Sequence, residues 1–264
     1  MRTLITRLPV MGTLLAVAAI ATWTGVSGTR LNATLVEFSG TTHCTGTLAP
    51  GEYDKVQVDD NQTCTMTQAN TVEGNVTVEE HATLNDLGGI IKESLNVDDG
   101  GNLVTNSGTG YGSNRPTIED NLDADGPASL QVRNTDVGGD LSVSDLEGGN
   151  PNNFICSSTV GDDLTVKKDD KTPASPIDIG GSSCSEGGGN TIHGNAKIEN
   201  ERYPVDFSNN TVGHDLTVKG NEPGGATVDN NSVGHDADCH DNSPFSGSGN
   251  TAPQNDCNGT ASDS

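Results

Sequence analysis

The sequence predicts an all-β fold, a right-handed parallel β-helix (a solenoid) with coils of about 20 residues. Two observations lead to this fold class: short segments repeat along the chain, and each copy alternates apolar with polar residues. The segments 56–64, 76–84 and 95–103 align without gaps, at offsets of 20 and 19 residues. A second set of copies comprises 136–143, 159–166, 211–218 and 232–239, with a degenerate copy at 190–198.

Each copy contains an apolar, polar, apolar triplet, as in Leu216, Thr217 and Val218. A period of two places both apolar side chains on one face of a short strand. One strand cannot bury that face alone, but coils stacked about 4.8 Å apart bury a continuous apolar column. The alternative is a β-sandwich, whose strands are not expected to repeat in sequence. Repetition therefore favours the β-helix.

The amino-terminal segment, residues 1–28, has the pattern of an export signal. Arg2 and Arg7 precede an apolar stretch, which small residues follow. That stretch is shorter than the roughly 20 residues of a membrane span, so no span is expected after the signal is removed. We therefore expect a secreted, extracellular or cell-envelope protein.

The rest of the chain divides into a repeat domain and a tail. Residues 29–242 form the expected β-helix domain, with insertions near 105–125 and 167–189, where the repeats lose their regular spacing. Insertions in a solenoid map to loops at its corners. Residues 243–264 are polar and are expected to form a C-terminal tail, tied back by Cys257.

The charge balance is strongly acidic, with 37 Asp and Glu against 13 Lys and Arg, a formal net charge of −24. A surface of that sign repels phosphate, so no nucleic acid is expected as a partner, and anionic lipid is a poor partner. Cations or cell-wall components are the partners that such a surface suits. The sequence leaves the oligomeric state open.

Six cysteines in an exported chain are expected to form three disulfides. Two spacings, of 20 and 18 residues, are close to one coil, and neighbouring coils bring Cα atoms within disulfide reach. Zinc is the alternative ligand, but no C-x-x-C pair is present. The expected pairs are Cys44 with Cys64, Cys156 with Cys184, and Cys239 with Cys257.

The V-x-G-x-(V/L)-x-V repeats and the segments 44–53 and 209–218 resemble secreted bacterial β-helix proteins, especially actinobacterial ones. More distantly, the triplets resemble the polymer-forming core of bactofilins, although bactofilins are cytosolic and lack paired cysteines. The likeness covers roughly residues 43–240. It implies a β-helical architecture and transfers no catalytic residue.

The sharpest candidate site is a column of carboxylates, which we call the acidic column. Equivalent carboxylates on stacked coils lie about 4.8 Å apart and repel one another. Calcium, which takes roughly six to eight oxygen ligands, would relieve that repulsion, and it is the one alternative to the expectation that the chain has no cofactor. The sequence favours a solvated acidic edge, which discourages lateral association, over such a calcium site. The column consists of Asp59, Asp60, Glu79, Glu80, Asp98 and Asp99.

A second candidate is a histidine cluster near the C-terminal end of the repeats. Its imidazoles and carboxylates could hold a transition metal if they converged. In other copies Gly139 and Asp162 fill the position of two of its histidines, which favours a role as polar corner residues. The cluster consists of His214, Asp215, His235, Asp236, Asp238, Cys239, His240 and Asp241.

These observations predict a non-enzymatic exported protein that acts through its surface as a structural, adhesive or cation-binding element. The alternative is a carbohydrate-active β-helix enzyme, a polysaccharide lyase or a glycosidase. A lyase needs a basic residue near calcium-binding carboxylates, and Arg115, Arg133 or Arg202 could supply it. Aromatic residues make up only 3% of the chain, which leaves little surface on which sugar rings can stack.

Overall fold

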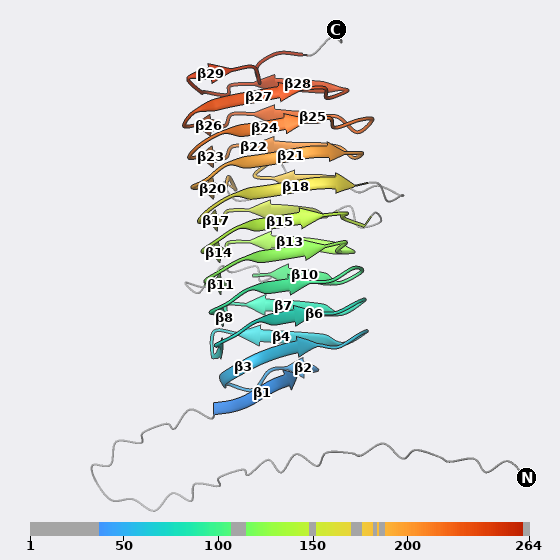
Figure 1. The fold of residues 1–264 in the computed structure, drawn as a ribbon, viewed down its shortest axis with the longest axis vertical. Coiled ribbons are helices and arrows are strands. Elements are labelled where there is room, and N and C mark those ends of the chain that lie inside the picture. Colours follow the sequence, from blue (N-terminus) through green and yellow to red (C-terminus); the bar gives the residue numbers. More distant parts are fainter. Residues whose placement is uncertain are drawn as a thin grey trace, which may run out of the picture. The chain divides into compact units, whose positions relative to one another are not determined.

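The computed structural model describes residues 37–106, 115–147, 152–169, 176–181, 184 and 188–260. In this part of the chain every named strand pairing is parallel, and no helix is present. Val56 pairs with Val76 and Val76 with Leu95, so the coils repeat at the predicted offsets. As the chain rises, near strands run to the right and far strands return to the left, which makes the winding right-handed (Figure 1). The β-helix is confirmed, and the sandwich alternative is wrong.

The described strands form two sheets, of 19 and ten strands. The ten-stranded sheet, here called sheet B, takes one strand from each coil. Its strands are β2 (Gly46–Thr47), β4 (Thr63–Thr67), β7 (Thr83–Leu87), β10 (Asn102–Thr105), β13 (Ser129–Arg133), β16 (Asn153–Cys156), β19 (Ile177–Ile179), β22 (Val205–Ser208), β25 (Ala226–Asp229) and β28 (Phe245–Ser248).

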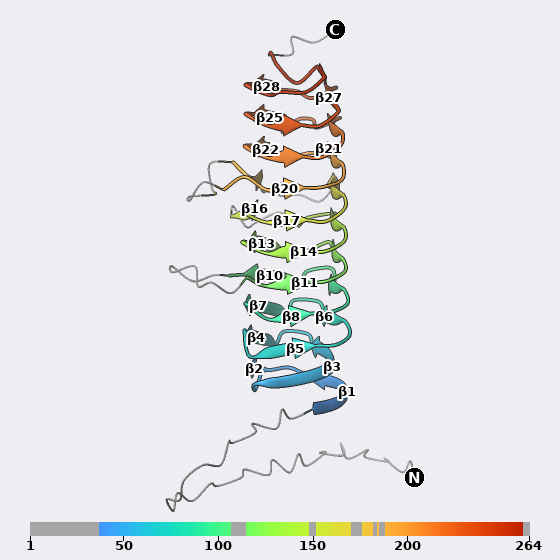
Figure 2. The ribbon, with the colours of Figure 1, turned by 90° about the vertical axis from the view of Figure 1, so that its left-hand side faces the viewer.

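The 19-stranded sheet, here called sheet A, bends at a corner into two columns of strands. Figure 2 shows the short column facing the viewer, beside the long column. At the start of the solenoid lie β1 (Glu37–His43) and β3 (Gly51–Val58), and β3 pairs with strands of both columns. The short column contains β5 (Asn70–Val72), β8 (Ile90–Ile91), β11 (Thr117–Ile118), β14 (Asp136–Val137), β17 (Thr159–Val160), β20 (Thr191–Ile192), β23 (Thr211–Val212) and β26 (Ser232–Val233). The long column contains β6 (Val76–Val78), β9 (Leu95–Val97), β12 (Leu122–Asp125), β15 (Leu141–Ser144), β18 (Leu164–Asp169), β21 (Ala196–Glu201), β24 (Leu216–Lys219), β27 (Asp236–His240) and β29 (Gln254–Asn255).

The core is the stack of apolar residues that the triplets predict. In the long column both apolar positions of each triplet point inward and, apart from the partly buried Cys239, are buried, while the middle residue faces out. Parallel pairing places the same residue type at equivalent positions of neighbouring strands: Leu141 pairs with Leu164, and Val143 pairs with Val166. Each rung therefore covers the apolar face that its neighbour could not bury alone.

A buried ladder of asparagines ties the later coils together. The Oδ1 atom of Asn210 accepts the backbone N–H of Asn190 at 2.9 Å, and its Nδ2 donates to the carbonyl of Ile179 at 2.9 Å. Asn231 and Asn250 repeat both contacts on the following coils. An amide side chain suits this corner because it donates and accepts at once. The ladder satisfies backbone groups that would otherwise be buried without partners.

A second, exposed ladder occupies the corner between the two columns of sheet A. Here the Asp of the repeated Gly-x-Asp element accepts the backbone N–H of the equivalent residue one coil later. Asp140 Oδ1 accepts from Asp163 N at 2.9 Å, and Asp163 Oδ1 accepts from Asn195 N at 2.7 Å. These repeated carboxylates therefore have a structural role, as turn residues that cap the next coil.

Three disulfides join the predicted cysteine pairs. Cys44 bonds to Cys64 and Cys239 to Cys257, with Cα atoms 5.5 and 4.9 Å apart, at the two ends of the solenoid. The third bond, from Cys156 to Cys184, spans 28 residues beside β16. The terminal bonds hold the coils that have a neighbour on only one side.

Two parts of the domain plan differ in detail from expectation. The segment expected as a tail, 243–264, carries β28 and β29, which pair with β25 and β27 and so continue the solenoid. Within the expected insertions, β11, β12 and β19 take regular places in the sheets. The signal segment, residues 1–28, lies outside the described residues.

Candidate functional site

The acidic column lies at the turns that follow β3, β6 and β9. Each turn contains a residue with positive φ: Asn61 at 59°, His81 at 58° and Gly100 at 75°. Glycine adopts this backbone conformation without strain, and asparagine and histidine adopt it more often than most other residues, so the residue types favour the bend. The two carboxylates before each bend are thereby placed on the outer surface, one pair above the next.

The structure brings five of the six predicted carboxylates together. They line an open hollow of about 310 Å³, and its lining residues are Asp60, Glu79, Glu80, Asp98 and Asp99. Asp59 does not line the hollow. Its Oδ1 atom lies 2.7 Å from Nδ1 of His43. Glu79 also accepts a hydrogen bond from Gln57, and Glu80 lies 3.6 Å from the ring of His81.

The carboxylates of the hollow are stacked side by side and do not form a cage. Among the described residues no three His, Cys, Asp or Glu side chains converge closely enough to hold a metal ion. The sequence therefore predicted where these acids lie, but a calcium ion would require their side chains to rotate inward. Asp60, Glu80, Asp98 and Asp99 are exposed at these turns.

The histidine cluster is spread over the surface. The rings of His214 and His235 stack with centroids 5.2 Å apart and planes 3° from parallel, one coil above the other. His240 lies beside its own neighbours, with Nδ1 2.9 Å from Asp241. Cys239 is bonded to Cys257 and so offers no thiolate. Stacked rings direct their nitrogen lone pairs alongside one another, so the described geometry favours corner residues over a metal site.

The three arginines suggested for catalysis lie in different surroundings. Arg115 bridges coils, because its Nη2 atom lies 2.8 Å from Asp136 and donates to the carbonyls of Thr135 and Ser157. Arg202 is exposed, between β21 and β22. Arg133 ends β13 on the outer face of sheet B. None of the three lines the acidic hollow.

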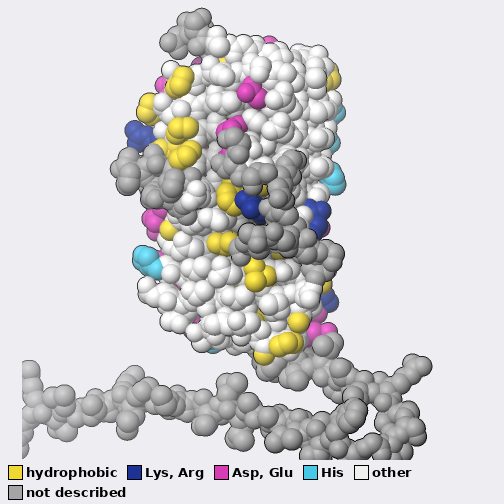
Figure 3. Space-filling model, turned by 180° about the vertical axis from the view of Figure 1, so that it is seen from behind, with side chains coloured by type: hydrophobic (Ala, Val, Ile, Leu, Met, Phe, Trp, Pro, Cys, Tyr) yellow, Lys and Arg dark blue, Asp and Glu magenta, His cyan; other side chains and the backbone are white. Residues whose placement is uncertain are grey.

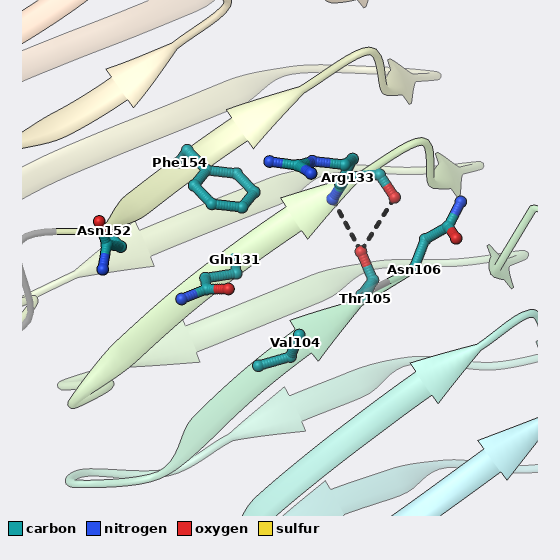
Figure 4. A pocket seen from close by; sticks show the side chains of 7 residues that line it. All are labelled: Val104, Thr105, Asn106, Gln131, Arg133, Asn152 and Phe154. Carbon is teal, nitrogen blue, oxygen red and sulfur yellow. Dashed lines mark hydrogen bonds between the residues drawn. The ribbon is translucent and has the colours of Figure 1, made fainter. Parts of the chain in front are cut away.

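A further hollow, which sequence reasoning missed, surrounds Arg133. It has a volume of about 310 Å³ and lies on sheet B, over β10, β13 and β16. We call it the Arg133 hollow; its lining residues are Val104, Thr105, Asn106, Gln131, Arg133, Asn152 and Phe154. Figure 4 shows Arg133 and Phe154 pointing toward one another from neighbouring strands. The sequence gives a partial indication of this hollow, because side chains alternate between the two faces of β13 and so Gln131 and Arg133 lie on the same face.

A buried carboxyl group also escaped the sequence analysis. Asp86, at the inner side of β7, accepts the N–H groups of Gly88 and Gly89 through Oδ1, at 3.1 and 2.7 Å. Among the described residues its Oδ2 atom has no hydrogen-bond partner. Burial raises the pKa of the Asp86 carboxyl to about 6, and the two backbone donors offset part of that shift. An Asp followed by Leu-Gly-Gly is typical of an Asx turn, which could have indicated its place.

Comparison of the chain with known proteins identified no relative. The chain matches no protein-family profile, no curated protein and no solved structure. The resemblance to secreted actinobacterial β-helix proteins and to bactofilins therefore stays a prediction from the repeats. In the described ranges, no helix has the length and apolar character needed to cross a membrane.

Proposed function

We propose that this chain is an exported, non-enzymatic protein whose β-helical rod acts through its outer surface, as a structural or adhesive element of the cell envelope or its surroundings. The observation that carries the proposal is the unbroken stack of coils, bonded by disulfides at both ends. Disulfides of this kind persist in oxidising compartments, which supports export. A solenoid offers long regular faces suited to binding extended partners.

The surface supports a role without catalysis. The hollow of the acidic column and the Arg133 hollow are both open, and each has a volume of about 310 Å³, at the small end of ligand sites. Arg115 forms an ion pair with Asp136 and donates hydrogen bonds to backbone carbonyls, so it has a structural role. The competing function remains a polysaccharide lyase or glycosidase, which would draw on Arg115, Arg133 or Arg202.

Export and adhesion are tested on the full chain, produced with a C-terminal tag in a secreting bacterium. We expect the tagged protein in the medium or envelope fraction, with residues 1–28 removed as read by mass spectrometry. Retention of the protein in the cytosol contradicts export. The purified protein is then incubated with isolated envelope material and with a panel of polysaccharides.

We expect the protein to sediment with envelope material and to release no new reducing ends or unsaturated sugars. Failure to sediment with any envelope fraction contradicts the adhesive role. Release of products that stops in Arg115→Ala, Arg133→Ala or Arg202→Ala would establish the enzyme instead. The variants must keep the circular dichroism of the parent, so that loss of product reports chemistry and not unfolding.

Calcium binding by the acidic column is a second candidate function. The favouring observation is the shared hollow, in which carboxylates of three successive coils face the same space. Stacked like charges repel, and a divalent cation removes that repulsion.

A further inference from the structure

We propose that the C-terminal end of the solenoid is a closed association surface, which joins a second copy of this chain as a two-fold dimer once it is opened. The segment that closes it comprises residues 254–260, here called the strap, and includes β29. Association is measured on the purified protein, so it is independent of the function proposed above. The step involves pairing of strands only.

A glycine on β28, the last described strand of sheet B, makes room for the strap. A column of inward-facing positions on this sheet ends at Gly247, and its preceding members are buried: Ile179, Phe207 and Val228. Gly247 has no side chain, and the fully buried Cys257 of the strap lies against it. A Cβ atom on Gly247 would overlap with the carbonyl oxygen of Cys257. The apolar column is therefore interrupted at the point where the strap enters the core.

The strap also makes the hydrogen bonds that a further coil would make. The N–H of Gly247 donates to the carbonyl of Gly259, and the N–H of Gly259 donates to the carbonyl of Gly247, both at 2.8 Å. At the next corner Asn258 continues the asparagine ladder, because its Oδ1 atom accepts the N–H of Asn250 at 3.1 Å. Unpaired backbone groups on a sheet edge are a template for another strand. The strap therefore blocks an edge that would otherwise pair with a second chain.

The direction of the strap indicates how a second copy would pair. Gly247 and Gly259 meet in an antiparallel bridge, whereas β28 pairs with β25 in parallel, and so does β29 with β27. The β28 strand of a second copy, related by a two-fold axis, can take the place of the strap with the same antiparallel direction. A two-fold pair uses the edge of both copies and closes at the dimer. Head-to-tail stacking would pair β28 with β2, which offers only two residues against the four of β28.

Charge sets the conditions for this association. Acidic side chains lie on the visible face near the C-terminal end of the rod (Figure 3), and Asp238 is exposed on β27, the strand that pairs with β29 of the strap. Two copies that meet at this end bring like charges together, which repel. Salt screens repulsion between exposed charges. Association of the opened end should therefore become stronger as sodium chloride is added.

The test opens the end with one side chain in the full chain. Gly247→Val restores an apolar side chain above Val228 and leaves no space for Cys257, so we expect the strap to be displaced while the core is kept. Size-exclusion chromatography with light scattering should give the parent as a monomer and Gly247→Val a mass that rises toward twice that value with protein concentration. Amide exchange in β28 of this variant should slow over the same range. Ser246→Val adds the same side chain at the exposed neighbouring position and should keep the parent mass.

A second variant opens the end by another route and decides the matter if Gly247→Val loses the circular dichroism of the parent. Cys239→Ala, Cys257→Ala removes the disulfide that ties the strap to β27, so a dimer is expected here as well. A parent as dimeric as Gly247→Val, equal masses of Gly247→Val and Ser246→Val, or a monomeric cysteine variant overturns the proposal. A dimer that weakens as salt is added overturns pairing through the β28 edge. Species larger than a dimer overturn the two-fold pair in favour of head-to-tail stacking.

Discussion

At the scale of single residues, Asp86 connects the stability of the rod to pH. Its carboxyl has a pKa of about 6 in the folded chain against 3.8 for the free group, because burial disfavours the charge. A raised pKa means that the folded state binds the proton more tightly than the unfolded state does. The contribution to stability is therefore fully present below pH 3.8 and is lost as pH rises through about 6.

Asp86→Asn should stabilise the protein at high pH. The amide keeps an oxygen for the Gly88 and Gly89 N–H groups and carries no charge, so we expect a gain of about 3 kcal/mol at pH 8, from two pKa units at 1.36 kcal/mol each. Near pH 3 the gain should vanish. Urea denaturation at both pH values measures it, with the exposed Asp256→Asn as control. A gain that does not change with pH contradicts the assignment.

Asn210 allows a test of how much one rung of the buried asparagine ladder contributes to the free energy of unfolding. Asn210→Ala removes the acceptor of Asn190 N–H and the donor to the Ile179 carbonyl, both buried. Each orphaned group costs about 1–3 kcal/mol, so the free energy of unfolding should fall by several kcal/mol. Thr211→Ala, the exposed next residue, should change it by about 0.5 kcal/mol at most. Equal losses in the two variants would show that the ladder contributes nothing.

At the scale of elements, the turn that carries the acidic column is the place to test for calcium. If calcium binds with a millimolar dissociation constant, a tenfold excess over that constant stabilises the folded state by about 1.4 kcal/mol. The melting temperature should then rise by a few degrees, and sodium chloride at equal ionic strength should raise it less. The triple variant Asp60→Asn, Glu80→Gln, Asp99→Asn should abolish the difference. An equal shift in the variant removes the calcium hypothesis.

The register of the elements was predictable because each triplet carries its own period. Val58, Val78 and Val97 align with one another in the sequence, and the same residues pair with one another in the sheet. The Arg133 hollow was not predictable in the same way, since it depends on which side chains three irregularly spaced coils place side by side. The segment around β28 was also missed, because Phe245 and its neighbours carry no copy of the triplet. Local pattern predicts pairing, whereas a site requires knowledge of neighbours across coils.

At the scale of the whole molecule, the terminal disulfides should decide where the rod opens. Each coil contacts only its neighbours, so an end coil has half the support of a central one. In the double variant Cys44→Ala, Cys64→Ala we expect amide hydrogen exchange to become fast in β2 and β4 and to stay slow in β21 to β24. The variant Cys239→Ala, Cys257→Ala should do the same at β27 and β29. Uniform loss of protection along the chain would mean that the rod unfolds as one unit.

The asparagine ladder also makes the length of the molecule adjustable. Asn210 and Asn231 are 21 residues apart and occupy the same place on successive coils. Excision of residues 211–231 would join Asn210 to Ser232, which stands where Thr211 stood, and every ladder bond would find an equivalent partner. We expect this shortened chain to fold, with a hydrodynamic length reduced by one rung. Gain or loss of whole turns, and not of single residues, is thus the natural step by which such a chain grows or shrinks.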